Sequence, residues 1–172
     1  MNRGEENISV VLLLGSNDIE AENLVERAIA IIGLSVGAIN RRSEFYRSAP
    51  YGFTAEREFV NCAIELTSEA DAYEVLRRIN LIEALLGRDR DKEMEVKALS
   101  NEPYASRPID IDIIFYGDET FSDQRLTIPY HFLDEREYAL RPVAEIVAER
   151  KHPALSKTPR EMLEALTNRL YH

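Results

Sequence analysis

The stretch Arg107-Pro108-Ile109-Asp110-Ile111-Asp112-Ile113-Ile114-Phe115 indicates a buried β-strand that carries two acidic side chains. Successive side chains of a strand point to opposite faces. The apolar residues that would share one face are Ile109, Ile111, Ile113 and Phe115. Asp110 and Asp112 would then project together from the other face, roughly 6 to 7 Å apart along the strand. Two like charges held this close need a cation between them, or one must take up a proton.

The acid pair has two interpretations. Hard oxygen ligands suit Mg²⁺, which proteins usually bind through one or two carboxylates together with substrate phosphates. The alternative is a solvent-facing strand edge whose two acids bind nothing. The Asp-x-Asp pattern alone does not separate these interpretations, so the surrounding segments have to decide.

Apolar periodicity on the N-terminal side of this strand predicts a sheet with helices. The expected elements are a strand at 8–14, a helix at 21–32, strands at about 37–46 and 59–66, and a helix at 69–86 that Gly87 ends. With the Asp-x-Asp strand, the order is βαββαβ, which is the split βαβ or ferredoxin-like arrangement. We therefore predict an α+β sandwich in which helices cover one face of an antiparallel sheet and leave the other face available.

The remaining segments add no second domain. Residues 1–7 form a polar N-terminal extension, and the polar stretch 89–106 is expected to be a flexible loop. Short helical additions follow the acidic strand, at 142–148 and in a final helix. Thr158-Pro159-Arg160-Glu161 begins that helix with a capping box and a proline in the first turn. We expect one domain over 1–172.

Composition limits the classes of function. The chain has 172 residues, 45% of them hydrophobic, and a formal charge of −10, which argues against a nucleic-acid binder with a basic stripe. The single cysteine, Cys62, lies among apolar residues and is expected to be a buried thiol in a reducing compartment. No run approaches the roughly 20 apolar residues that span a bilayer, and the first residues contain no apolar signal segment. We expect a cytoplasmic monomer or weak homodimer that binds neither nucleic acid nor membranes.

Arginines gather in particular segments of this acidic chain. They are Arg88, Arg90, Arg107, Arg125, Arg136 and Arg141. If they converge in the fold, they would form a local anion site that suits phosphate. Dispersed surface arginines are the alternative.

Several polar and aromatic side chains would point away from the predicted helices. Asn61 would project beside Phe59 from one strand, and Asp110 and Asp112 from another strand of the same sheet. Gly15 ends the first strand, where a backbone could approach a ligand closely. An aromatic ring, an amide and accessible backbone groups suit a flat heterocycle with donors and acceptors.

Taken together, several segments resemble one enzyme family. They are Leu14-Gly15-Ser16-Asn17, Phe45-Tyr46-Arg47-Ser48-Ala49-Pro50, Phe59-Val60-Asn61-Cys62-Ala63, Gly87-Arg88, Arg107-Pro108-Ile109-Asp110-Ile111-Asp112 and Leu126-Thr127-Ile128-Pro129. Their order is similar to that in 6-hydroxymethyl-7,8-dihydropterin pyrophosphokinase, an enzyme of folate synthesis. That enzyme transfers a pyrophosphoryl group from ATP to the pterin hydroxymethyl group and releases AMP.

The resemblance implies roles for individual residues. The implied catalytic residues are Arg88, Arg107, Asp110 and Asp112, and the two aspartates would hold two Mg²⁺ ions against the ATP phosphates. The implied pterin-binding residues are Gly15, Ser48, Tyr51, Phe59, Asn61 and Tyr138. The implied ATP-binding residues are Asn80, Glu83, Arg125, Thr127, Tyr130, His131 and Arg136. For this last set, a solvated face or a structural turn is the alternative.

The chain departs from the family pattern in several segments, among them the loop that closes over ATP in the family. Pro103 stands where a basic residue is frequent, Tyr104 where tryptophan is common, and the stretch 89–106 is longer and more acidic. Ala49 replaces a common proline, and Ile-Pro-Tyr130-His131 replaces the usual Ile-Pro-His. A pterin- or nucleotide-binding module that has lost efficient transfer therefore stays as an alternative to an active enzyme.

Overall fold

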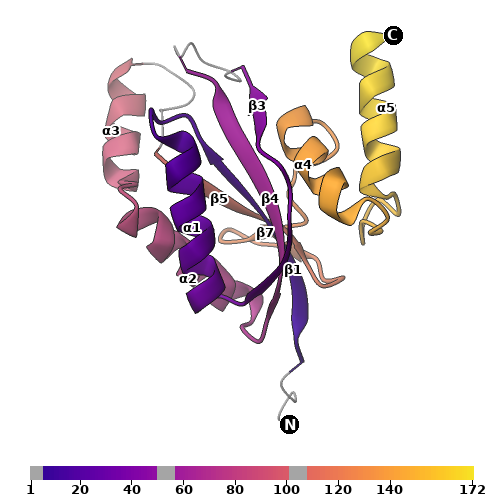
Figure 1. The fold of residues 1–172 in the computed structure, drawn as a ribbon, viewed down its shortest axis with the longest axis horizontal. Coiled ribbons are helices and arrows are strands. Elements are labelled where there is room, and N and C mark those ends of the chain that lie inside the picture. The colour runs from indigo at the N-terminus through magenta and orange to yellow at the C-terminus, as the bar shows by residue number, and fades with distance from the viewer. Residues whose placement is uncertain (1–5, 50–56, 101–107) are drawn as a thin grey trace.

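The computed structural model describes residues 6–49, 57–100 and 108–172, and Figure 1 shows a central sheet with helices on both sides. None of the helices within these ranges has both the length and the apolar character of a membrane span. In chain order the elements are β1 (Ile8–Ser16), α1 (Ala21–Ser35), β2 (Ala38–Arg42), β3 (Tyr46–Ser48), β4 (Phe59–Ser68), α2 (Ala72–Leu85), α3 (Arg90–Ser100), β5 (Asp110–Tyr116), β6 (Phe121–Ser122), β7 (Thr127–Ile128), α4 (Glu137–Val147) and α5 (Pro159–Tyr171).

The main sheet has the order β2-β4-β1-β5, and all of its paired strands are antiparallel. β2 and β3 lie one after the other along the same edge of β4. Between them, the Ser43 N–H donates to the Ala63 carbonyl at 2.8 Å, and the Ser43 hydroxyl accepts from the Ala63 N–H at 2.9 Å. The strand predicted over 37–46 is therefore two shorter strands. The predicted α+β fold class with its βαββαβ order is confirmed.

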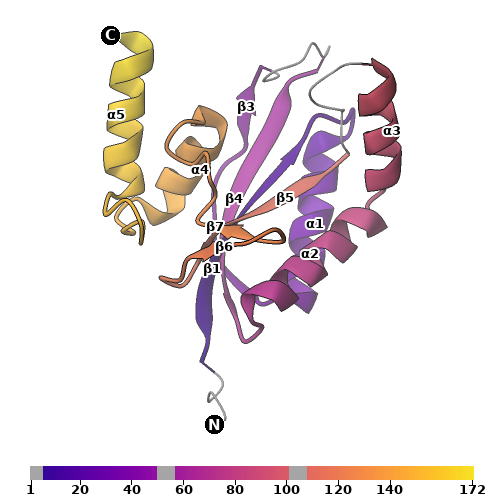
Figure 2. The same cartoon turned by 180° about the vertical axis from the view of Figure 1, so that it is seen from behind.

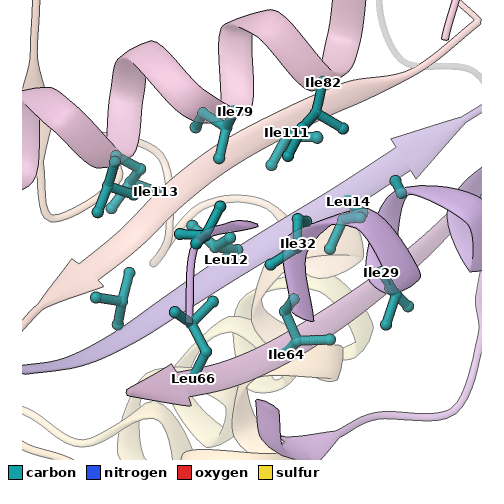
Figure 3. Close-up of a cluster of buried hydrophobic side chains, with 14 of the residues drawn as sticks. Leu12, Leu14, Ile29, Ile32, Ile64, Leu66, Ile79, Ile82, Ile111 and Ile113 are labelled. Carbon is teal, nitrogen blue, oxygen red and sulfur yellow. The ribbon is translucent and has the colours of Figure 1, made fainter. Parts of the chain in front are cut away.

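The first face of the sheet is buried under α1 and α2, as Figure 3 shows. Alternate residues of β1, β4 and β5 meet apolar residues of both helices. The labelled set in the figure is Leu12, Leu14, Ile64, Leu66, Ile111 and Ile113 from the strands with Ile29, Ile32, Ile79 and Ile82 from the helices. Each such side chain stabilises the fold by roughly 1.5–3 kcal/mol relative to its exposed state. This core anchors the strands that carry the polar residues of the other face.

The second face is partly covered as well, so the prediction that it stays open was wrong. α4 packs on this face, and α5 packs on α4 from outside, as Figures 1 and 2 show from opposite sides. The cause lies in β1, which has Val11 and Leu13 on this face in addition to the apolar residues of the first face. A central strand that is apolar on both faces has to be buried on both. The second core contains Val11, Leu13, Ala63, Phe115, Leu140 and Val143.

A bulge in β5 corrects one detail of the predicted strand. Val11 pairs with Phe115 whereas Leu12 pairs with Ile113, so Ile114 is an extra residue. A bulge shifts the alternation of side chains by one position. Phe115 therefore packs in the second core, whereas Ile113 packs in the first. The prediction that these two residues share a face was wrong.

The stretch expected to be a loop over 89–106 is helical over Arg90–Ser100. The Asp89 carboxylate accepts the Lys92 N–H at 3.1 Å, which caps the new helix. Acidic residues lie in its first turn and Lys97 in its last, which suits the helix dipole. Local capping therefore produces a helix in a segment whose apolar pattern is too weak to predict one.

Candidate active site

A row of residues crosses the sheet near the end of β1. Gly15 pairs with Asn61 of β4 on one side and with Asp110 of β5 on the other, and Asn61 pairs in turn with Tyr46 of β3. Residues directly opposite each other on neighbouring antiparallel strands project from the same face. Because Ile111 packs in the first core, this row lies on the face that α4 partly covers. The structure thus brings an amide and a carboxylate to the two sides of a glycine.

Gly15 provides the space in this row that the Asn61 side chain occupies. A Cβ atom at Gly15 would lie 2.5 Å from the Nδ2 atom of Asn61, so no other residue fits without moving the amide. Asn61 is 5% exposed, and its Nδ2 group donates to the Leu14 carbonyl at 3.4 Å. Within the described ranges, its Oδ1 atom is buried with no hydrogen-bond partner. An unpaired buried acceptor of this kind costs about 1–3 kcal/mol, so it is suited to take a donor from a ligand.

Other predicted pterin residues lie beside this row. Ser48 of β3 pairs with Phe59, which is on the same face of β4 as Asn61. Tyr138 comes from the first turn of α4, and its hydroxyl lies 3.2 Å from the hydroxyl of Tyr130. Tyr51, which has the same implied role, lies outside the described residues.

The two tyrosines lie in the electrostatic field of the acid pair. Burial is the main cause that raises the pKa of Tyr130 and of Tyr138, and the charges of Asp112 and Asp110 add to it. Both phenols are therefore protonated at neutral pH.

Asp110 and Asp112 are half-buried and project from the same face of β5. The Nη1 group of Arg88 donates to Asp110 at 2.7 Å. In the part of the chain that the structure describes, no group of three or more His, Cys, Asp or Glu side chains could hold a metal. Two carboxylates fit Mg²⁺ only together with phosphate oxygens, which is the usual way this ion is held. The donor set therefore suits a metal that arrives with a nucleotide.

Arg88 lies at the centre of a buried network of charges. It follows Gly87, whose φ of +102° ends α2 as the predicted C′ residue. Its side chain is 3% exposed, and its guanidinium pairs with Glu83, with Asp110 and, through Nε at 3.0 Å, with Glu93 of α3. Burial lowers the pKa of Arg88, but the surrounding carboxylates raise it above its usual value. Arg88 is therefore a fixed cation next to the acid pair.

Glu83 of α2 connects this network to the edge of the sheet. Its side chain is 1% exposed, and its Oε2 atom accepts from Arg88 and from the Ile111 N–H at 2.9 Å. β5 is an edge strand, so this N–H has no strand partner on its outer side. The Oε1 atom of Glu83 accepts from Arg90 at 2.8 Å. Burial raises the pKa of Glu83, and Arg88 opposes this shift. The implied ATP residue thus has both carboxylate oxygens engaged by protein donors.

A groove of about 820 Å³ runs along the end of α2 next to this network. Residues that line it include Asn80, Glu83, Arg88, Arg90 and Arg125. Arg125 stacks on the ring of Tyr73 at 5.0 Å from its centroid, and Arg90 donates to the Asn80 side chain at 3.3 Å. Three of the arginines singled out in the sequence therefore converge here, with the polar character that a phosphate chain needs.

The other implied ATP residues do not line this groove. They are Thr127, Tyr130, His131 and Arg136. Thr127 is exposed on β7, whereas the Tyr130 N–H donates to the Ile114 carbonyl at 3.1 Å and so lies beside β5. His131 and Arg136 both contact the ring of Phe132. Of these residues, Tyr130 packs against the second core, on the side of the sheet that α4 covers.

Two further arginines have different places. Arg141 pairs with Glu137 on α4, away from the groove at the end of α2. Arg107 lies outside the described residues, as do the departures at Pro103 and Tyr104.

Sequence reasoning assigned no role to Glu93 as a partner of Arg88. In the sequence it is one of several acids in a segment predicted to be a loop. Its contact with Arg88 depends on α3, whose first turn places the carboxylate against the guanidinium. The capping pattern that begins at Asp89 is the signal that could have revealed it.

Comparison with known proteins agrees with this geometry. The chain matches the family model described as 7,8-dihydro-6-hydroxymethylpterin-pyrophosphokinase over residues 11–148. A Methylorubrum extorquens protein named 2-amino-4-hydroxy-6-hydroxymethyldihydropteridine pyrophosphokinase is 36% identical over 122 residues, which cover 71% of this chain and 69% of that protein. A Haemophilus influenzae protein of the same name is 30% identical over 143 residues, which cover 83% of each chain.

Solved structures agree in fold. The Plasmodium falciparum structure titled HPPK-DHPS wild type aligns with a TM-score of 0.76 at 17% identity, over 98% of this chain and 46% of that one. This chain thus spans less than half of that longer protein, and at this identity the likeness concerns the fold alone. The family match covers residues 11–148, which include most of β1 and all of β4 and β5, the strands that carry the row and the acid pair. The chain therefore belongs to the 7,8-dihydro-6-hydroxymethylpterin-pyrophosphokinase family.

Proposed function

We propose that this chain transfers the pyrophosphoryl group of ATP to 6-hydroxymethyl-7,8-dihydropterin, giving the pterin diphosphate and AMP in folate biosynthesis. Family membership and the names of the relatives support this activity. The observation that carries it is the row in which Gly15 separates Asn61 from Asp110, with Arg88 paired to that aspartate. A cytoplasmic location and a monomer or weak homodimer stay predictions from the sequence.

The pterin would bind over Gly15, beside the Asn61 amide. The unpaired Oδ1 atom of Asn61 would accept an N–H group from the edge of the ring. Phe59 of β4 and Tyr138 of α4 would supply aromatic surface for the ring. Ser48 lies directly across from Phe59 and adds a hydroxyl. Together these groups suit a flat ring with polar edges.

The ATP polyphosphate would lie between the acid pair and the groove at the end of α2. Arg88, Arg90 and Arg125 offer guanidinium groups for phosphate oxygens, and Asn80 adds an amide. Arg88 is the one that contacts the acidic strand directly, so it would lie closest to the transferred group. Its charge would stabilise the negative charge that develops there.

Asp110 and Asp112 would hold Mg²⁺ together with phosphate oxygens, in the two-ion arrangement that the resemblance implies. When bound, the metal would neutralise phosphate charge and align the attacking and leaving oxygens. In the transfer itself, the pterin hydroxymethyl oxygen bonds to the β-phosphorus while the bond to the α–β bridging oxygen breaks. AMP leaves with that electron pair, and the hydroxyl proton passes to water. The protein's part is to hold the two substrates in line and to surround the β-phosphoryl group with positive charge.

The test is to incubate the purified chain with ATP, Mg²⁺ and the hydroxymethyldihydropterin, and to measure AMP and pterin diphosphate by chromatography. We expect both products in equal amounts, with none when EDTA removes the metal. Pterin binding without AMP formation would instead identify a binding module that has lost transfer.

A further inference from the structure

The guanidinium of Arg88 has two faces for anions, and different acids occupy them. The Nη1 group is directed at Glu83 and Asp110. The Nε and Nη2 groups are directed at the two carboxylate oxygens of Glu93, at 3.0 Å and 3.5 Å. This side-on pair of donors is the arrangement by which an arginine binds a phosphate through two parallel hydrogen bonds. Glu93 therefore occupies the edge of Arg88 that a phosphate would use.

Glu93 differs from the other two acids around Arg88 in the element that carries it. Glu83 is 1% exposed and also holds the Ile111 N–H, so moving it would leave a strand amide unpaired. Asp110 is held within β5. Glu93 has a side chain that is 17% exposed, and it belongs to α3, against which no described helix or strand packs extensively. Figures 1 and 2 show α3 beside the end of α2, away from the sheet.

Glu93 and a phosphate carry charge of the same sign. A polyphosphate that approached Arg88 would therefore be repelled by Glu93 in its present position. Release of Glu93 would remove this repulsion and would free the bidentate edge of Arg88 at the same time.

We infer that Glu93 competes with the ATP polyphosphate for Arg88, so that α3 carries an internal acidic competitor that nucleotide binding has to displace. The inference rests on the proposed function, because it concerns the same arginine. It makes Glu93 a residue that sets nucleotide affinity without contacting the pterin. Loss of its charge should therefore strengthen nucleotide binding and leave pterin binding unchanged.

The test uses the full chain and an ATP analogue in which a methylene group replaces the oxygen between the α- and β-phosphates, so that no transfer occurs. Calorimetric titration in the presence of Mg²⁺ gives its Kd. For Glu93→Gln we expect binding about three- to fivefold tighter than in the unchanged protein, the upper range for a single ion pair. Glu95→Gln is the matched control, because it removes the same charge from an exposed position of the same helix and should change Kd by less than about twofold.

Equal Kd values for the two variants, or weaker binding in Glu93→Gln, would overturn the inference. If Glu93→Gln does not fold, the Arg88 Nε–H resonance of the ¹⁵N-labelled unchanged protein decides: it should shift when the analogue saturates the site, and a constant resonance overturns the inference. Failure of the proposed function is a separate result, because it would appear as absence of AMP in the unchanged protein with ATP and pterin.

Discussion

Gly15 and Asn61 fit side by side only because Gly15 has no side chain, since a Cβ atom there would lie 2.5 Å from the Asn61 Nδ2 atom. The two residues are paired across β1 and β4, and Asn61 is almost fully buried. The amide therefore has little freedom to move away. Its orientation depends on a residue in the neighbouring strand.

Gly15→Ala should weaken pterin binding by about tenfold or more, because the new methyl group displaces the Asn61 amide by a distance that hydrogen bonds do not tolerate. Fluorescence titration with the pterin measures this. Gly33→Ala is the control: it lies on α1 with ordinary van der Waals space around the added atom, and should stabilise the fold by about 0.5–1 kcal/mol. Unchanged pterin affinity in Gly15→Ala would exclude Gly15 from the proposed site.

Asn61→Leu should separate stability from binding. It removes a buried acceptor that has no partner in the described structure, so the free energy of unfolding should stay constant or rise by about 1 kcal/mol. Pterin binding should be lost. Urea denaturation and the fluorescence titration measure the two effects, and a large loss of stability with intact binding would show that the amide is structural.

Asp112→Ala should reduce AMP formation by at least about a hundredfold while the melting temperature changes little, because the side chain is half-buried and its proposed role is to hold metal. Asp118→Ala removes an exposed acid from the turn after β5 and serves as the control. Rates measured across a series of Mg²⁺ concentrations give the comparison. Equal rates for the two variants would exclude Asp112 from the metal site.

Glu83→Gln should impair both folding and transfer. It keeps an acceptor for the Ile111 N–H but removes the charge that Arg88 and Arg90 share, at a cost of about 2–4 kcal/mol. The kcat for AMP formation should fall more than the pterin affinity, because Arg88 loses its fixed position. Glu74→Gln, which removes a half-buried acid that pairs with Arg77 on the same helix, should have a much smaller effect on both. A normal kcat in folded Glu83→Gln would show that Asp110 and Glu93 suffice to position Arg88.

His152 should make stability depend on pH. Its Nδ1 atom accepts the N–H groups of Ala154 and Leu155, at 3.1 Å each, which requires the neutral ring. Burial lowers the pKa of His152 in the folded protein, although Asp134 opposes the shift. The stabilisation is therefore complete above the unfolded pKa of about 6.5 and is lost as the pH falls below it through the lowered folded pKa.

Urea midpoints between pH 7.5 and pH 5 measure this dependence. His152→Asn keeps a side-chain acceptor that does not titrate in this range, so its midpoint should fall less over the same interval. Identical slopes for the two proteins would assign the pH dependence to other groups.

Much of the fold could be predicted because the deciding signals are local. The apolar run of β1, the helical spacing of α1 and α2 and the glycine after α2 each reflect interactions within a few residues. The bulge in β5 could not be predicted, because it depends on how Val11 and Leu12 meet the neighbouring strand. The packing of α4 on the second face could not be predicted either, because it depends on where α4 returns to the sheet.

By itself, the sequence determined the order of elements, the shared face of Asp110 and Asp112 and the family, since these follow from alternation, periodicity and short motifs along the chain. The tertiary structure decided which groups meet. Gly15 comes between Asn61 and Asp110 through strand register, and Glu93 meets Arg88 because a capped helix follows a glycine turn. Such contacts join residues far apart in the chain or across a change of direction, where no local pattern specifies distance.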